Sequence, residues 1–135
     1  MFENDYLMRI ILQFVAALQR ALRENRASPV AEAQDLEALV GNAVNIDARL
    51  FFSLAPESMV SMLQLGDFDP QLGGYVLRSM YLEAELLDES DQPDKAQLRR
   101  EQADAIAQAY GFDVTPADIE PEALEAFLNP PEEED

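Results

Sequence analysis

A long apolar segment near the N-terminus constrains the fold of this chain more than any other feature. Residues 5–24 read DYLMRIILQFVAALQRALRE, and their apolar positions recur every three or four residues, as in an α-helix. A helix that is apolar nearly all round is buried on several sides. We therefore expect the other helices to wrap this one, or a second copy of the protein to cover what they leave open. Two adjacent stripes carry its apolar surface: Leu7, Ile11, Phe14, Leu18 and Leu22, and then Met8, Leu12, Val15 and Gln19.

This first helix has start and end signals of its own. Asn4 and Asp5 are both favourable N-cap residues, so we expect the helix to begin there. Arg20, Arg23 and Arg26 recur near its expected end. Cations are favoured at a helix C-terminus, so we interpret these arginines as part of the helix end rather than as a ligand site.

Proline and capping residues mark the ends of the remaining helices: Ser28 before Pro29 and Asp47 are N-cap signals, and Gly111 is placed to end the last long helix. No alternating run of β-branched residues indicates a strand. We predict an all-α fold of six or seven helices, with two antiparallel helical hairpins joined by short helices. Residues 1–129 form one helical domain, and residues 130–135 (PPEEED) form a disordered acidic tail. The expected helices after the first span residues 29–44, 48–54, 56–65, 70–87 and 93–110, followed by short turns at Pro116 and Pro121.

The composition excludes several kinds of site. The 135 residues include no Cys and no His, which excludes zinc sites built on thiolate or imidazole and Ser-His or Cys-His nucleophile pairs. We therefore expect a protein that is not an enzyme and needs no cofactor, and we assign no catalytic, cofactor-binding or metal-binding residue.

The net charge of −18 is unevenly distributed along the chain. Residues 1–54 carry five Arg and seven acidic residues, whereas residues 55–135 carry four basic and twenty acidic residues. Such a surface repels nucleic acid and anionic membranes and would suit a basic protein partner. Glu3 and Asp5 replace the basic residues of a signal peptide, and Arg9 interrupts the apolar run. We therefore expect a cytoplasmic location without a membrane span.

The last two long helices carry charges on their inner faces. A helical wheel places Glu83 within the apolar face of residues 72–87 and Arg99 at the edge of the inner face of residues 93–110. Folding this hairpin about its turn brings the two to the same level. Because an unpaired buried charge is costly, we predict a Glu83–Arg99 pair, shared with Arg100.

Two acidic pairs on the same helices suggest the alternative of an enzyme. Glu85 and Asp88, and then Glu101 and Asp104, are similar to the acidic helix motifs of all-helical nucleotide pyrophosphohydrolases, which hold Mg²⁺. The wheel, however, directs these pairs outward and away from one another. A magnesium-dependent hydrolase is therefore the alternative to a binding protein, and a shared cleft around the four carboxylates would distinguish them.

A cluster of large apolar residues lies in the middle of the chain. Phe51, Phe52, Met59 and Met62 fit either the core or a soft binding surface, and core is the commoner outcome.

Two resemblances bear on the whole chain. The segment Phe2-x-x-Asp5-Tyr6-Leu7-Met8-Arg9-x-Ile11 resembles the start of a family of small all-helical proteins of unknown function from Gram-positive bacteria. The last hairpin, with Ala84, Leu87, Ala96 and Ala103, resembles a degenerate tetratricopeptide unit. These resemblances imply an all-helical bacterial protein with no assigned activity.

We expect a non-enzymatic helical module for protein–protein interaction, homodimeric through its first helix. Excess apolar surface on that helix and the missing catalytic side chains favour this interpretation.

Overall fold

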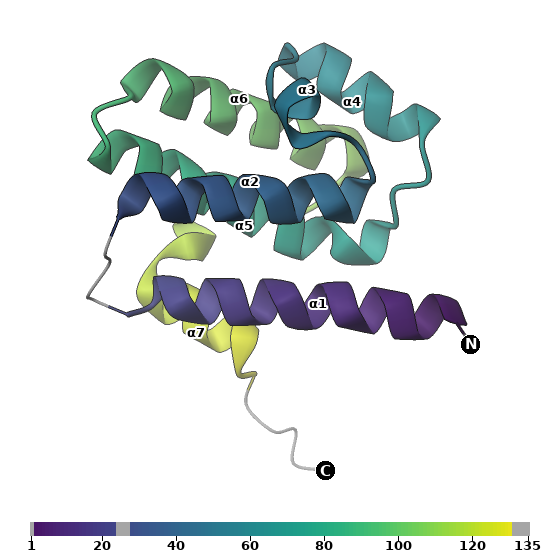
Figure 1. Ribbon diagram of the computed structural model, residues 1–135, viewed down its shortest axis with the longest axis horizontal. Helices are drawn as coiled ribbons and strands as arrows, with labels where there is room; N and C mark the ends of the chain where they lie inside the picture. Colours follow the sequence, from purple (N-terminus) through teal and green to yellow (C-terminus); the bar gives the residue numbers. More distant parts are fainter. Residues whose placement is uncertain (1, 24–27, 131–135) are drawn as a thin grey trace.

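The computed structural model describes the backbone of residues 2–23 and 28–130, and the side chains from residue 5 onward. No strand is present in these residues, and seven α-helices follow one another, which confirms the predicted all-α fold (Figure 1). Residues 131–135 of the predicted acidic tail lie outside the described part. The helices are α1 (Phe2–Ala21), α2 (Pro29–Val44), α3 (Ala48–Phe52), α4 (Pro56–Leu65), α5 (Gly73–Glu89), α6 (Pro93–Tyr110) and α7 (Pro121–Leu128), with 3₁₀ turns η1 (Pro70–Leu72) and η2 (Pro116–Ile119).

Helix α5 is the central helix of the molecule. It forms an antiparallel hairpin with α6, and α2 packs along it (Figure 1). The six consecutive residues 79–84 are all buried, and they cover more than one full turn. No side of α5 therefore faces water over this stretch. Helix α4 packs against α6 and completes that side of the core.

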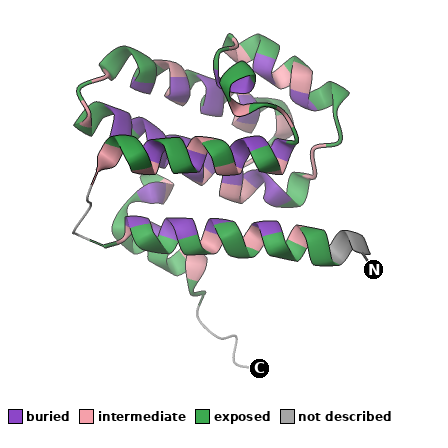
Figure 2. Ribbon diagram, viewed as in Figure 1, coloured by how far each residue is buried: buried purple, intermediate pink, exposed green. Residues whose placement is uncertain are grey.

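Of the two alternatives expected for the first helix, the one in which the other helices wrap it is wrong. Helix α1 runs antiparallel to α2 at the edge of the molecule and contacts α2, α5 and α7 (Figures 1 and 2). Phe14 and Leu18 are fully buried, whereas Met8 and Leu12 are 54% and 59% exposed. The first stripe thus enters the core at Phe14 and Leu18, with Ile11 half-buried at its border, whereas Met8 and Leu12 of the second stripe face outward. In the described residues no element covers the outer side of α1, whereas α5 has packing partners before and after it in the sequence.

The capping residues act as the sequence predicts. The Ser28 hydroxyl accepts a hydrogen bond from the Ala31 N–H at 3.2 Å, and Asp47 accepts one from the Leu50 N–H at 3.2 Å. Gly111 ends α6 in the left-handed conformation, with φ of 74°. Each of these groups satisfies backbone atoms that a helix end leaves unpaired.

The boundaries of α1 differ from the prediction. The helix begins at Phe2, so Asn4 and Asp5 lie inside it rather than at its cap. It ends at Ala21, so Arg20 lies in the last turn and Arg23 follows the helix. Arg26 lies outside the described residues.

Aromatic contacts fix α7 and α1 to the central helix. The Tyr75 ring of α5 stacks on Phe14 of α1 at 5.8 Å and meets Phe127 of α7 edge-on at 5.1 Å. At the start of α5, Gly73 lies against the ring of Phe112, and a Cβ there would be only 2.3 Å from the Phe112 Cζ atom. A side chain at position 73 would therefore require the Phe112 ring to shift.

Candidate functional site

The predicted pair between α5 and α6 is present and fully buried. Arg99 Nε lies 2.9 Å from Glu83 Oε2, although its N–H is not aligned for a hydrogen bond. The prediction that Arg100 shares this pair is wrong, because Arg100 instead forms an ion pair with Asp88. Arg100 lies one position further round α6, which directs its side chain away from the core.

A second acid, Glu37 of α2, completes this network and was not predicted. Its Oε2 atom accepts a hydrogen bond from Arg99 Nη2 at 3.0 Å. Glu37 lies four positions from both Ala33 and Gly41, which are on the buried face of α2. That spacing is the one signal in the sequence that Glu37 faces the core.

The network also holds the end of α3. Arg99 Nη1 donates to the Gln102 side-chain oxygen at 2.6 Å, and Gln102 Nε2 donates to the carbonyls of Phe52 at 3.1 Å and Leu54 at 2.7 Å. The Arg99 guanidinium lies 4.3 Å from the centre of the Phe52 ring. Side chains from α2, α5 and α6 thus converge on one buried cation.

Two carboxyl groups compete for this single cation. Burial raises the pKa of Glu83 well above its usual value, and sharing a hydrogen bond with Glu37 raises it further, while Arg99 opposes the shift. The geometry thus places one guanidinium between two carboxyl groups, Glu37 at 3.0 Å and Glu83 at 2.9 Å. We interpret this network, which is buried except for the 29% exposed side chain of Glu37, as a contact that specifies how α2, α5 and α6 pack.

The structure does not assemble the four carboxylates of the enzyme alternative into one site. Glu85, Asp88, Glu101 and Asp104 are all exposed. Asp88 pairs with Arg100, whereas Asp104 accepts a hydrogen bond from the Tyr81 hydroxyl at 2.6 Å. Across residues 5–23 and 28–130, no group of three or more acidic side chains could hold a metal ion.

Three of the four central Phe and Met residues belong to the core. Phe51, Phe52 and Met59 are buried, whereas Met62 is only half-buried. The two Phe rings meet edge-on at 5.3 Å. This cluster anchors α3 and α4 on the hairpin, which leaves α1 as the element with an unmatched apolar side.

That apolar side is the outer stripe of α1, which we define as Met8, Ile11, Leu12 and Val15. Met8 and Leu12 are more than half exposed, and Ile11 and Val15 are half-buried. Their spacing of three and four residues places them on one flank of the helix. Within residues 6–23, which contain the stripe, every charged residue is an arginine. The stripe is therefore apolar and free of acidic groups in a strongly acidic protein.

The described helices do not include a segment with the length and hydropathy of a membrane span. Comparison with known protein families, curated proteins and solved structures finds no match to this chain.

Proposed function

We propose that this protein is a non-enzymatic helical interaction module that self-associates through the outer stripe of α1. The exposure of Met8 and Leu12 carries the proposal. Both are large apolar side chains that recur on one helix flank, and the half-buried Ile11 and Val15 extend them into a continuous strip. Apolar surface of this kind gains free energy when it leaves water.

The charge distribution favours a second copy of the chain as the partner. A net charge of −18 makes two copies repel each other over most of their surface. Residues 1–54, which include α1, contribute only −2 of that charge, and no acidic residue occurs between Asp5 and Glu24. Two copies therefore approach with least repulsion through α1.

The geometry of the stripe fits an isologous contact. The same surface on both copies packs about a two-fold axis, so each α1 buries the outer stripe of the other. From Met8 to Val15 the stripe is roughly 10 Å long at about 1.5 Å per residue. An interface of this length is small, so we expect a weak dimer that depends on concentration.

Light scattering with a matched pair of variants tests this proposal. Leu12→Asp introduces a charge into the stripe, and Leu65→Asp makes the same change at a leucine of α4 that is 89% exposed. We expect the wild type and Leu65→Asp to approach twice the 15.1 kDa mass of one chain as concentration rises, and Leu12→Asp to remain at 15.1 kDa.

A wild type that keeps the mass of one chain would overturn self-association. The measurement should extend to a protein concentration of about 1 mM. At that concentration even a binding free energy of about −4 kcal/mol produces a measurable dimer fraction. Equal loss of the dimer in both variants would instead show that added charge, and not the stripe, controls association.

A further inference from the structure

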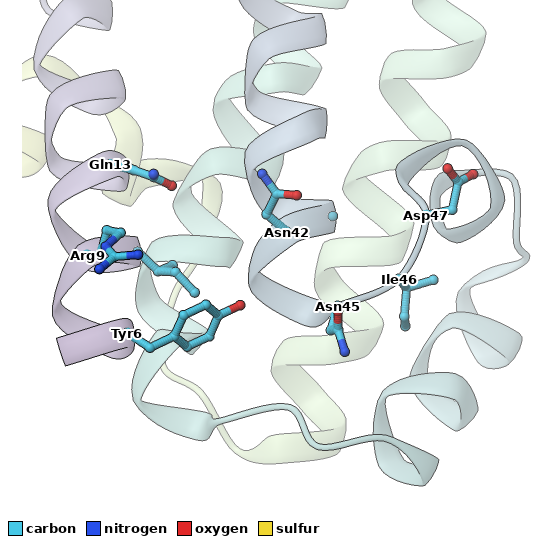
Figure 3. Close-up of a pocket in the computed structure, with 9 residues that line it drawn as sticks. Tyr6, Arg9, Gln13, Asn42, Asn45, Ile46 and Asp47 are labelled. Atoms are coloured by element: carbon cyan, nitrogen blue, oxygen red, sulfur yellow. The ribbon is translucent and has the colours of Figure 1, made fainter. Parts of the chain in front are cut away.

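The opposite flank of α1 borders a polar cleft that the outer stripe does not reach. The cleft has a volume of about 420 Å³ and lies between α1, the C-terminal turns of α2 and the start of α3. Figure 3 shows Tyr6 and Gln13 extending from α1 toward α2, where Asn42 and Asn45 lie. Arg9 and Asp47 complete its polar lining. Clefts that bind ligands are commonly of this size.

Five exposed polar side chains of this cleft are available to hydrogen-bond with a ligand. Those of Tyr6, Arg9, Gln13, Asn42 and Asn45 form neither a hydrogen bond nor an ion pair with any other described residue. Each of the three amides offers both a donor and an acceptor. A main-chain peptide unit has the complementary acceptor and donor, so this set of groups suits the backbone of an extended peptide.

A second, more apolar hollow continues the cleft. It has a volume of about 530 Å³ and shares Tyr6, Ile10 and Asn45 with the first. Leu7, Ala43 and Leu72 form its apolar wall, and Asp67 and Asp69 stand at its edge. An aliphatic stem could pack on that wall while its charged end reaches the two aspartates.

Three features of this second hollow favour the binding of a positively charged side chain. Asp67 makes no hydrogen bond or ion pair with other described residues, and Asp69 uses Oδ1 to cap η1, which leaves Oδ2 free. Helix α2 ends at Val44 with Asn45 as its C-cap, so the negative end of its dipole also lies here. The surrounding protein carries a large negative charge, which adds to the attraction.

We propose that the joined cleft binds an extended peptide that carries a lysine or arginine. The amides of Gln13, Asn42 and Asn45 bind its main chain, Arg9 donates to a main-chain carbonyl, and Asp67 and Asp69 bind the basic side chain. This inference deepens the proposed interaction function by naming a partner class. It uses the other flank of α1, so peptide binding and self-association are separable.

An NMR titration of the isotopically labelled full chain tests the proposal. The probe is the peptide acetyl-Ala-Ala-Lys-Ala-Ala-amide, compared with the same peptide carrying Glu in place of Lys. We expect the lysine peptide to shift the side-chain amide signals of Asn42 and Asn45 and to bind about fivefold more tightly than the glutamate peptide. The double variant Asp67→Asn/Asp69→Asn should abolish that preference.

The control is Asp91→Asn/Asp113→Asn, which removes the same charge from two exposed positions elsewhere. It should retain the preference for lysine, and so should the self-association variant Leu12→Asp. Equal binding of both peptides, shifts that map outside the cleft, or an equal loss in the control would each overturn the peptide site. A monomeric wild type that still prefers the lysine peptide would reject self-association alone.

Discussion

Two adjacent glycines at the start of α5 differ in how closely other residues approach them. Gly73 touches the Phe112 ring, whereas the nearest atom to a Cβ on Gly74 would be Arg78 Nη1 at 3.1 Å, at the end of a flexible side chain. We expect Gly73→Ala to destabilise the protein by about 1–3 kcal/mol through overpacking. Gly74→Ala should be neutral or stabilise by up to about 1 kcal/mol, since alanine favours a helix.

Urea unfolding of both glycine variants measures this difference. Equal stabilities would contradict the close packing of Gly73 on Phe112.

The buried acid Glu83 makes a second prediction, on pH dependence. Its pKa in the folded protein lies well above the usual 4.5, so the unfolded chain releases this proton at a lower pH than the folded chain. The stabilising contribution of the proton is therefore complete below about 4.5 and is lost as the pH rises through the raised value. Glu83→Gln keeps the shape and stays neutral, so we expect its stability relative to the wild type to increase with pH.

Chemical denaturation at several pH values between about 4.5 and 8 follows this trend, with the exposed Glu125→Gln as the control. A Glu83→Gln difference that stays constant, or that shrinks as the pH rises, would contradict a raised pKa of Glu83.

For single residues, the sequence predicts those contacts that depend on helical periodicity or on neighbouring residues. The Glu83–Arg99 pair follows from the register of one hairpin, and the caps at Ser28, Asp47 and Gly111 follow from neighbouring residues. The contribution of Glu37 depends on how α2 packs against that hairpin, a contact between residues far apart in the sequence. The cleft beside Arg9 was not predicted for the same reason, because it exists only when α1 lies beside the end of α2.

At the scale of the helices, the N-terminus of α2 is capped by one side-chain hydrogen bond. The Ser28 hydroxyl accepts the Ala31 N–H, and Pro29 occupies the first helical position. We expect Ser28→Ala to lower the free energy of unfolding by about 1 kcal/mol. Ser61→Ala, at an exposed position within α4, should change it by less than about 0.5 kcal/mol. Thermal unfolding of the two variants compares them, and equal losses would exclude a specific role for the cap.

The positions of whole helices show where apolarity alone misleads. The first helix has more apolar surface than it buries, yet α5 is the helix that the others surround. Position in the chain explains the difference, since α5 packs against α2 from earlier in the sequence and against α6 and η2 from later. The exposed apolar residues of α1, a helix at the edge of the molecule, agree with the proposal that it contacts a second copy of the chain.

For the whole molecule, the charge of −18 predicts how association responds to salt. Like-charged copies repel each other, and salt screens that repulsion over a Debye length that falls from about 30 Å at 0.01 M to about 8 Å at 0.15 M. We therefore expect self-association to strengthen with added salt. Binding of the lysine peptide should weaken under the same conditions, because its attraction is electrostatic.

Sedimentation at several salt concentrations tests whether self-association strengthens with salt. The peptide titration at the same concentrations tests whether peptide binding weakens. Self-association that weakens with salt would indicate an interface held by ion pairs rather than by the outer stripe.

Contact between the outer stripes of two copies is the central claim, and isotope-filtered NMR tests it most directly. A mixture of labelled and unlabelled protein reports only those nuclear Overhauser effects that cross between copies. We predict such effects between the methyl groups of Met8, Leu12 and Val15 in one copy and the same residues in the other. Intermolecular effects confined to other helices, or none at the highest attainable concentration, would contradict self-association through α1.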